Sequence, residues 1–142
     1  MIDPKNVPPV AESELLARFI TQTKQFRSSD QTVKPDLFIP FRLTELSVTR
    51  HREATADELW RNGREIATLR QQTLYGRCDV GAGDCAIGPL SVMPDPILPP
   101  RVPYNPNHAN IAGFPAARDD QKALAIRIAL RASKRIVPPE GS

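Results

Sequence analysis

Hydrophobic residues recur along the chain at two spacings, which predict alternating helical and extended elements. The stretch ESELLARFITQTKQF predicts a first helix, with Ser13 able to cap its start. Its apolar residues recur at helical spacing: Leu15, Leu16, Phe19, Ile20 and Phe26. The next stretch, RSSDQTVKPDLFIPFR, is interrupted by proline, so its apolar residues are expected to pack as extended pieces.

A strand and a second helix follow. In TELSVTRH, Leu46 and Val48 alternate with polar residues, the period-two pattern of a half-buried strand. Thr55 then stands three residues before Glu58, the spacing of a capping box at a helix start. The helix DELWRNGREIATLRQQ carries its apolar face on Leu59, Trp60, Ile66 and Leu69. Gly63 lies on the same face and predicts close approach of another backbone.

The second half of the chain predicts more strands and a closing helix. TLYGRCDV and AIGPLSVMP read as strands, and the glycines between them favour an antiparallel hairpin; ANIAGF is a third candidate. In ARDDQKALAIRIALRASKRIV, Asp119 or Asp120 is expected to cap a helix that ends near Lys134 and Arg135. Its predicted core contacts are Leu124, Ile126, Ile128 and Leu130.

This order predicts a small single α+β domain. About three helices would pack on one face of a largely antiparallel sheet of three to four strands. The chain has 15 prolines among 142 residues, concentrated at both ends and in one internal connection. We therefore predict a tail at 1–12, the domain at 13–137 with a proline-rich loop at 94–106, and a second tail at 138–142.

We expect a cytoplasmic protein. No apolar stretch is long enough to span a membrane, and the N-terminus lacks the layout of a secretion signal. Cys78 and Cys85 are expected to be reduced, packed thiols, because the paired short spacing of a zinc site is missing; a disulfide remains an alternative. We expect no metal.

A glycine motif raises the question of a nucleotide cofactor. Gly81, Gly83 and Ala86 have the G-x-G-x-x-A spacing of dinucleotide-binding proteins. That motif works only when the glycines lead into a helix whose amides hold the pyrophosphate, and the following IGPLSVMPDP cannot form one. We read the motif as a turn and expect no cofactor.

The two histidines are the candidates for acid–base chemistry. His51 and His108 could serve a metal-independent nuclease, one as general base and the other as general acid. Arg50, Arg52 and Arg77 would then stabilise the charge of the transition state. The alternative is that His51 is an exposed loop-end residue and His108 a hydrogen-bonded anchor for the proline-rich segment.

Basic residues gather on the closing helix. The candidate binding residues are Lys122, Arg127, Arg131, Lys134 and Arg135. Such a stripe could bind an acidic protein surface or the phosphates of a nucleic acid. It could equally be a solvated face, because no aromatic residue is interleaved for base stacking.

Four motifs carry a resemblance to other proteins. ELSVTRH, ADELWRNG, TLYGR and NHANIAGFP occur in an order that resembles a group of small bacterial proteins without an assigned activity, over roughly residues 14 to 132. The resemblance implies a bacterial, cytoplasmic protein of one domain, and it implies no catalytic residue.

Three functional hypotheses remain open. The first is a binding or accessory module without catalysis, which docks an acidic partner through the basic helix and the proline-rich loop. The second is the two-histidine nuclease. The third is a structural subunit of a larger assembly, whose interface residues would include Phe38, Ile39, Phe41 and Ile97.

Overall fold

Five antiparallel strands form one sheet in the order β3-β1-β2-β5-β4. The computed structural model describes residues 6–139, so the outer parts of both predicted tails lie outside the described residues. The strands are β1 (Leu15–Ile20), β2 (Glu45–Arg50), β3 (Gly76–Gly81), β4 (Ser91–Pro94) and β5 (His108–Ala112). The helices are α1 (Ala56–Leu69), α2 (Ala82–Cys85) and α3 (Arg118–Arg131), with 3-10 turns η1 (Thr23–Gln25) and η2 (Pro35–Phe38). Within these residues, no helix combines the length and apolar character needed to cross a membrane.

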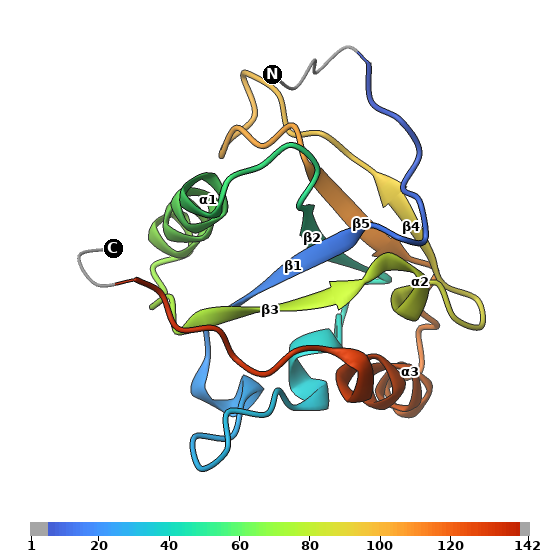
Figure 1. Ribbon diagram of the computed structural model, residues 1–142. Helices are drawn as coiled ribbons and strands as arrows, with labels where there is room; N and C mark the ends of the chain where they lie inside the picture. The colour runs from blue at the N-terminus through green and yellow to red at the C-terminus, as the bar shows by residue number, and fades with distance from the viewer. Residues whose placement is uncertain (1–5, 140–142) are drawn as a thin grey trace.

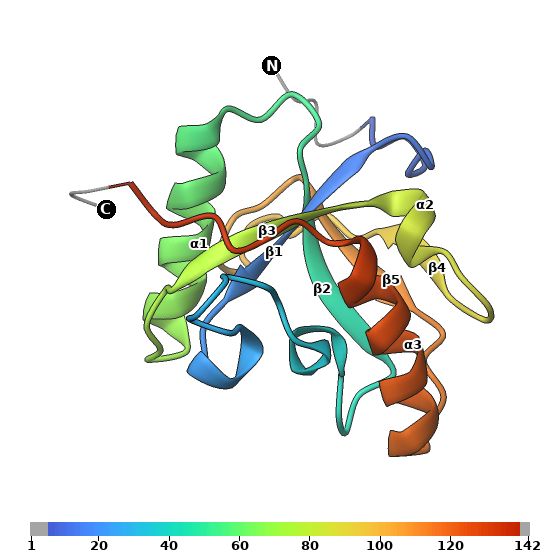
Figure 2. The ribbon, with the colours of Figure 1, turned by 60° about the horizontal axis from the view of Figure 1, so that its bottom comes forward.

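The predicted α+β class is confirmed, with a sheet that is wider than expected. The helices do not share one face of this sheet: α1 and α3 lie on opposite sides of it (Figures 1 and 2). Alternation along β1 explains the arrangement, because Leu16 and Ile20 join the core cluster that includes Leu124 and Ile128 of α3. Phe19 points the other way, against Gly63 of α1. Both faces of the sheet are therefore covered.

The first predicted helix is wrong, since residues 15–20 form strand β1 and Ser13 caps no helix. β1 lies between β3 and β2 and pairs with both. Leu16 and Ala17 are fully buried although they point to opposite faces. A strand covered on both faces carries an almost unbroken apolar run, and such a run also matches helical spacing.

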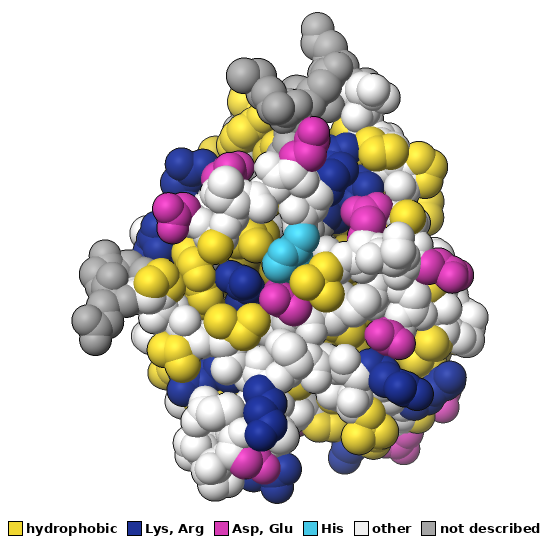
Figure 3. All heavy atoms as spheres, viewed as in Figure 1, with side chains coloured by type: hydrophobic (Ala, Val, Ile, Leu, Met, Phe, Trp, Pro, Cys, Tyr) yellow, Lys and Arg dark blue, Asp and Glu magenta, His cyan; other side chains and the backbone are white. Residues whose placement is uncertain are grey.

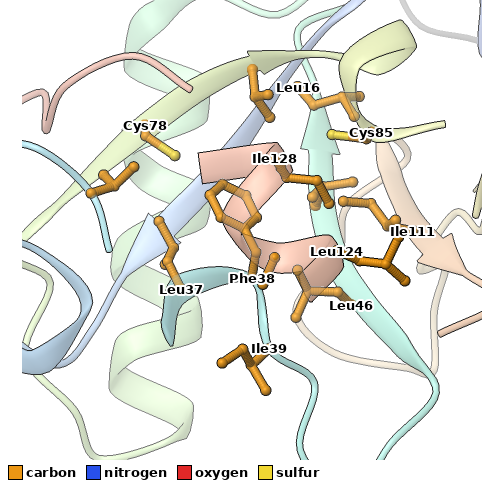
Figure 4. Packing of buried hydrophobic residues seen from close by; sticks show 14 of the residues in the cluster. Leu16, Leu37, Phe38, Ile39, Leu46, Cys78, Cys85, Ile111, Leu124 and Ile128 are labelled. Carbon is orange, nitrogen blue, oxygen red and sulfur yellow. The ribbon is translucent and has the colours of Figure 1, made fainter. Parts of the chain in front are cut away.

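The core lies between the sheet and the layer formed by α3 and η2 (Figure 4). Leu124 and Ile128 point into it, as predicted, whereas Ile126 is 41% exposed and Leu130 is 79% exposed. Residues two apart lie on different sides of a helix, so these four could not all face the core. The N-cap of α3 is Ala117, with Asp119 and Asp120 in the first turn rather than at the cap. The helix ends at Arg131, so Lys134 and Arg135 follow it.

Helix α1 begins with the predicted capping box. The Glu58 amide donates to Thr55 Oγ1 at 3.1 Å. Gly63 is required by a close approach, but the neighbour is the ring of Phe19 rather than a backbone: a Cβ at position 63 would lie 2.8 Å from two ring carbons. Because Gly63 has no side chain, α1 can pack directly against β1.

The sheet divides between β1 and β2. These strands pair at Leu16↔Arg50 and Ala17↔Thr49, near one end. By contrast, β1 pairs with β3 along its whole length, as β2 does with β5 from Glu45 to Thr49. The two halves of the sheet thus separate beyond Ala17.

The predicted strands of the hairpin are present, but the hairpin itself is wrong. β3 and β4 lie at opposite ends of the strand order, with α2 between them in the chain. The amides that were expected to form the turn bond elsewhere: Ala82 N donates to Glu14 O and Gly83 N to Glu12 O. These bonds tie the N-terminal segment to α2.

The outer side of β3 pairs instead with the C-terminal segment. Arg77 N donates to Ile136 O at 3.1 Å, and Ile136 N donates to Arg77 O at 2.8 Å. Gly76, with φ of +150°, permits this approach, because a Cβ there would collide with the carbonyl oxygen of Ile136. Residues 132–137 therefore belong to the folded domain.

Candidate functional site

His51 forms part of a charged cluster on the face of the sheet that carries α1. Its Nε2 lies 2.8 Å from Asp79 Oδ1, and Arg77 Nε donates to the same oxygen at 3.2 Å. The Arg77 guanidinium stacks over Trp60, 4.8 Å from the ring centroid. Burial raises the pKa of Asp79, but the hydrogen bonds and charges of His51 and Arg77 outweigh it and lower that pKa. Asp79 is thus held as a carboxylate.

His108 is engaged on β5, toward the opposite edge of the sheet from β3. Its Nδ1 lies 2.8 Å from Asp95 O, at the start of the proline-rich loop, as expected of an anchor for that segment. The register aligns His108 with Thr49, Thr49 with Ala17, and Ala17 with Asp79. With about 4.8 Å per strand, the backbones at His108 and Asp79 lie about 14 Å apart. His51 bonds to Asp79 on β3, whereas His108 bonds to Asp95 just after β4, at the other end of the strand order. This geometry gives no support to a shared phosphate site.

Arg50 holds the N-terminal segment in place through hydrogen bonds. It is 1% exposed and makes two bonds to the Glu14 carboxylate, from Nε at 2.7 Å and from Nη2 at 2.8 Å. Its Nη1 donates to Pro8 O at 2.9 Å. Burial raises the pKa of Glu14, but the bonds and charge of Arg50 outweigh it and lower that pKa. Arg52 likewise donates to Asn107 Oδ1, at 3.2 Å.

The predicted binding residues divide into two groups. Lys122, Arg127, Arg131 and Lys134 are exposed and form no ion pair with any described residue. Arg135 is instead tied down: it donates to Gln31 Oε1 and Tyr75 O, each at 2.6 Å, and stacks over Phe26. The structure therefore leaves four of the five guanidinium or ammonium groups open to a partner.

Two hydrophobic side chains stand among these basic groups. We define the α3 outer surface as Lys122, Ile126, Arg127, Leu130 and Arg131. Leu130 is 79% exposed and Ile126 is 41% exposed. Figure 3 shows basic and hydrophobic side chains next to one another over the position of α3. The helical pattern predicted both hydrophobic residues in the core, so this surface was not expected from the sequence.

The proline-rich loop lies beside α1 and is held by hydrogen bonds. Ile97 and Asn105 exchange backbone hydrogen bonds of 2.9 Å, and the buried Asn105 side chain donates to Thr49 Oγ1 at 3.1 Å. With α1 the loop borders a cavity of about 440 Å³, to which it contributes Val102 and Tyr104. The loop and α3 thus lie on opposite sides of the sheet (Figure 1).

Neither cysteine is placed for reaction. Cys78 and Cys85 are free thiols without exposed surface, as predicted for packed thiols. Burial raises the pKa of each to about 12, so both are protonated at neutral pH. Residues 6–139 contain no group of three or more side chains able to hold a metal ion.

The interface predicted for a structural subunit falls mainly in the core. Phe38 is fully buried and Ile39 is 7% exposed, both packed among the residues under α3. Phe41 and Ile97 are half-buried. Phe38 and Ile39 are therefore used by the fold itself.

Comparison with known proteins adds no function. The chain matches no protein-family model, no curated protein and no solved structure.

Proposed function

We propose that the protein is a binding module without catalysis, which docks an acidic protein partner through the α3 outer surface. The observation that carries this proposal is Leu130, which is 79% exposed between Arg127 and Arg131. The fold does not use this side chain, since Leu124 and Ile128 supply the contacts of α3 with the core. An exposed aliphatic group with a charged rim has the makeup of a protein interface.

The aliphatic residues favour a protein over a nucleic acid as the partner. A nucleic acid would use the basic groups for its phosphates, and its bases would stack on aromatic side chains, which the α3 outer surface lacks. A protein partner would use both kinds of group. Its hydrophobic side chains would cover Ile126 and Leu130, and its carboxylates would meet Lys122, Arg127 and Arg131.

The proline-rich loop is proposed as a second contact. Val102 is 71% exposed and Tyr104 is 51% exposed, next to α1. Because the loop lies across the sheet from α3, a partner that touches both must extend around the domain. A small partner would occupy one surface only.

Site-specific photo-crosslinking in the native cell tests this proposal. A photoreactive residue is placed at position 130 and, as a matched control, at position 15, where Leu15 is an exposed leucine of β1 (43%) outside both proposed contacts. We expect one acidic protein to crosslink from position 130 and not from position 15. The purified pair should then bind in a salt-sensitive manner, and R127E with R131E should abolish binding.

Two results would overturn the proposal. One is equal crosslinking from positions 130 and 15, which would mean that the α3 outer surface is not selective. The other is crosslinking from position 130 to nucleic acid, with binding that persists in L130S but not in R127E. R27E, at an exposed position between η1 and η2, controls for the general effect of charge reversal and should leave partner binding unchanged.

A further inference from the structure

A cavity opens where β1 and β2 separate. Its volume is about 220 Å³, and it reaches from the end of α1 to the segment after η2. The charged and polar side chains on its walls include Arg18, Lys24, Asp36, Glu45, Arg70, Gln72 and His108. The cavity is smaller than the roughly 300–1,000 Å³ of pockets for drug-sized ligands, so its size suits a small metabolite.

Arg18 crosses this gap and is bonded only to neutral groups among the described residues. It occupies a core-facing position of β1, between Leu16 and Ile20. Its Nε donates to Leu37 O and its Nη1 to Ser47 O, each at 3.0 Å. Asp36 and Glu45 line the same cavity, yet neither forms an ion pair with Arg18. A largely buried positive charge without a counterion is costly.

A second arginine, Arg70, adds positive charge to the wall of this cavity. Burial and the nearby charge of Arg70 lower the pKa of Arg18 to about 10, while Cys78 opposes this shift. Arg70 is exposed at the end of α1 and forms no ion pair within the described part of the chain. Two like charges therefore approach one cavity, and an anion between them would relieve the repulsion.

The opposite wall contains a strained residue. Phe41 has φ of +59°, a left-handed conformation that is rare for a bulky side chain. Lys24 Nζ lies 5.0 Å from its ring centroid, and the Arg118 guanidinium lies 4.8 Å from it. Such conformations persist where surrounding contacts enforce them, and they cluster at ligand sites. Gln72 Oε1, on the wall near Arg70, is buried without a hydrogen-bond partner and could accept from a ligand hydroxyl.

We infer that this cavity binds a small molecule through an oxyanion group, with Arg18 and Arg70 as its ligands. A guanidinium can donate two parallel hydrogen bonds to a phosphate or a carboxylate, which suits either oxyanion. The site lies apart from the α3 outer surface, so it adds a ligand to the docking function rather than explaining it. Partner binding and oxyanion binding can therefore fail separately.

Titration of the full chain with inorganic phosphate and with malonate, at an ionic strength held constant by sodium chloride, tests this inference. We expect saturable changes in the amide signals of residues 18–22, 45–49 and 70–72, and a rise in Tm with anion concentration. Preference for phosphate would identify a phosphorylated ligand, and preference for malonate would identify a carboxylic acid.

Two variants on α1 make the test selective. R70Q removes an exposed ligand without disturbing the core, and should weaken binding about tenfold or more. R61Q removes an equally exposed arginine of the same helix and should leave the affinity unchanged. R18K keeps a charge but not the planar fork, and should also weaken binding if it folds.

The inference is wrong if neither anion saturates, or if R70Q and R61Q bind as the unmodified chain does. It is also wrong if the changing amides lie on α3 instead of around the cavity. Because R70Q is at the surface, its result stands even if R18K does not fold.

Discussion

Helices α1 and α3 each contain 14 residues, yet they cover the two faces of the sheet in different ways. Under α3 the sheet presents apolar side chains, and Leu124 and Ile128 complete a continuous core with them. Under α1 the sheet also presents Arg77, Asp79 and Thr49, which are buried or half-buried and hydrogen-bonded. One interface depends mainly on packing, whereas the other adds polar contacts that need correct geometry.

The difference extends to the outer sides of the two helices. The N-terminus of α1 is fixed by its capping box, whereas the N-cap of α3 makes no side-chain bond. α3 also exposes two large aliphatic residues that its packing does not need. A helix that combines a well-packed inner face with an apolar outer face is suited to contacts on both sides.

The largest effect is expected from the inner face of α3. I128A should lower the free energy of unfolding by about 2–5 kcal/mol, because it leaves a cavity in a fully buried site. L130A, two residues away, should change it by no more than about 0.5 kcal/mol. Urea denaturation of both variants measures the contrast, and similar losses would contradict the division between the two sides of α3.

Asp79 provides the corresponding test beneath α1. D79N should cost about 1–3 kcal/mol at neutral pH, because it weakens the bonds from His51 and Arg77. The folded-state pKa of Asp79 is lowered, so its contribution is present above the unfolded value of about 3.9 and is lost as the pH falls through the folded value. D79N and the unmodified chain should converge in stability in strong acid, as denaturation at several pH values would show.

D119N serves as the control for Asp79, since Asp119 is an exposed carboxylate in the first turn of α3. Its effect should be much smaller at every pH. A loss in D79N that stayed constant down to strong acid would mean that the amide disturbs packing rather than charge.

The close contact between α1 and β1 predicts a smaller loss of stability, for the variant G63A. In G63A the new methyl group meets the Phe19 ring, and overpacking of this kind costs about 1–3 kcal/mol. Alanine has a better helix propensity than glycine, which offsets up to about 1 kcal/mol of this cost. We therefore expect the free energy of unfolding to fall by about 1 kcal/mol. E65A, at an exposed position of the same helix, should cause no comparable loss. A rise in the Tm of G63A would contradict the tight contact.

The smallest effects concern the helix starts. T55A should cost about 1 kcal/mol, because it removes the capping hydrogen bond of α1. A117D should add about 0.5–1 kcal/mol, because the N-cap of α3 has extended dihedrals and no side-chain bond. Thermal denaturation should show Tm changes of opposite sign. Changes of the same sign would mean that the two caps do not differ as described.

Local patterns predicted some elements well and others poorly. β2 and the start of α1 carry unambiguous signals, an alternating strand and a capping box. β1 could not be distinguished from a helix, because its burial on both faces arises from neighbours that are distant in sequence. The hairpin failed for the same reason: the partners of residues 82 and 83 are residues 12 and 14.

The candidate site shows the same limit. The open basic groups on α3 were predictable, because helical spacing alone places Arg127 and Arg131 on the outside. Asp79 was missed as the partner of His51, although its position two residues after Arg77 puts both on one face of a strand. Arg18 was not predicted as a site residue, because its segment was predicted to be a helix rather than strand β1. Its role depends on the separation of β1 from β2, which no local pattern encodes.

The pairing of residues 132–137 with β3 also bears on how copies of this chain behave together. An edge strand with free amides and carbonyls is a template on which another molecule can add a strand. Here Ile136 occupies those groups at Arg77, and the Ser133 amide donates to Asp79 O. Removal of everything after Arg131 would uncover this template, and the expected outcome is self-association and loss of solubility rather than a simple loss of stability.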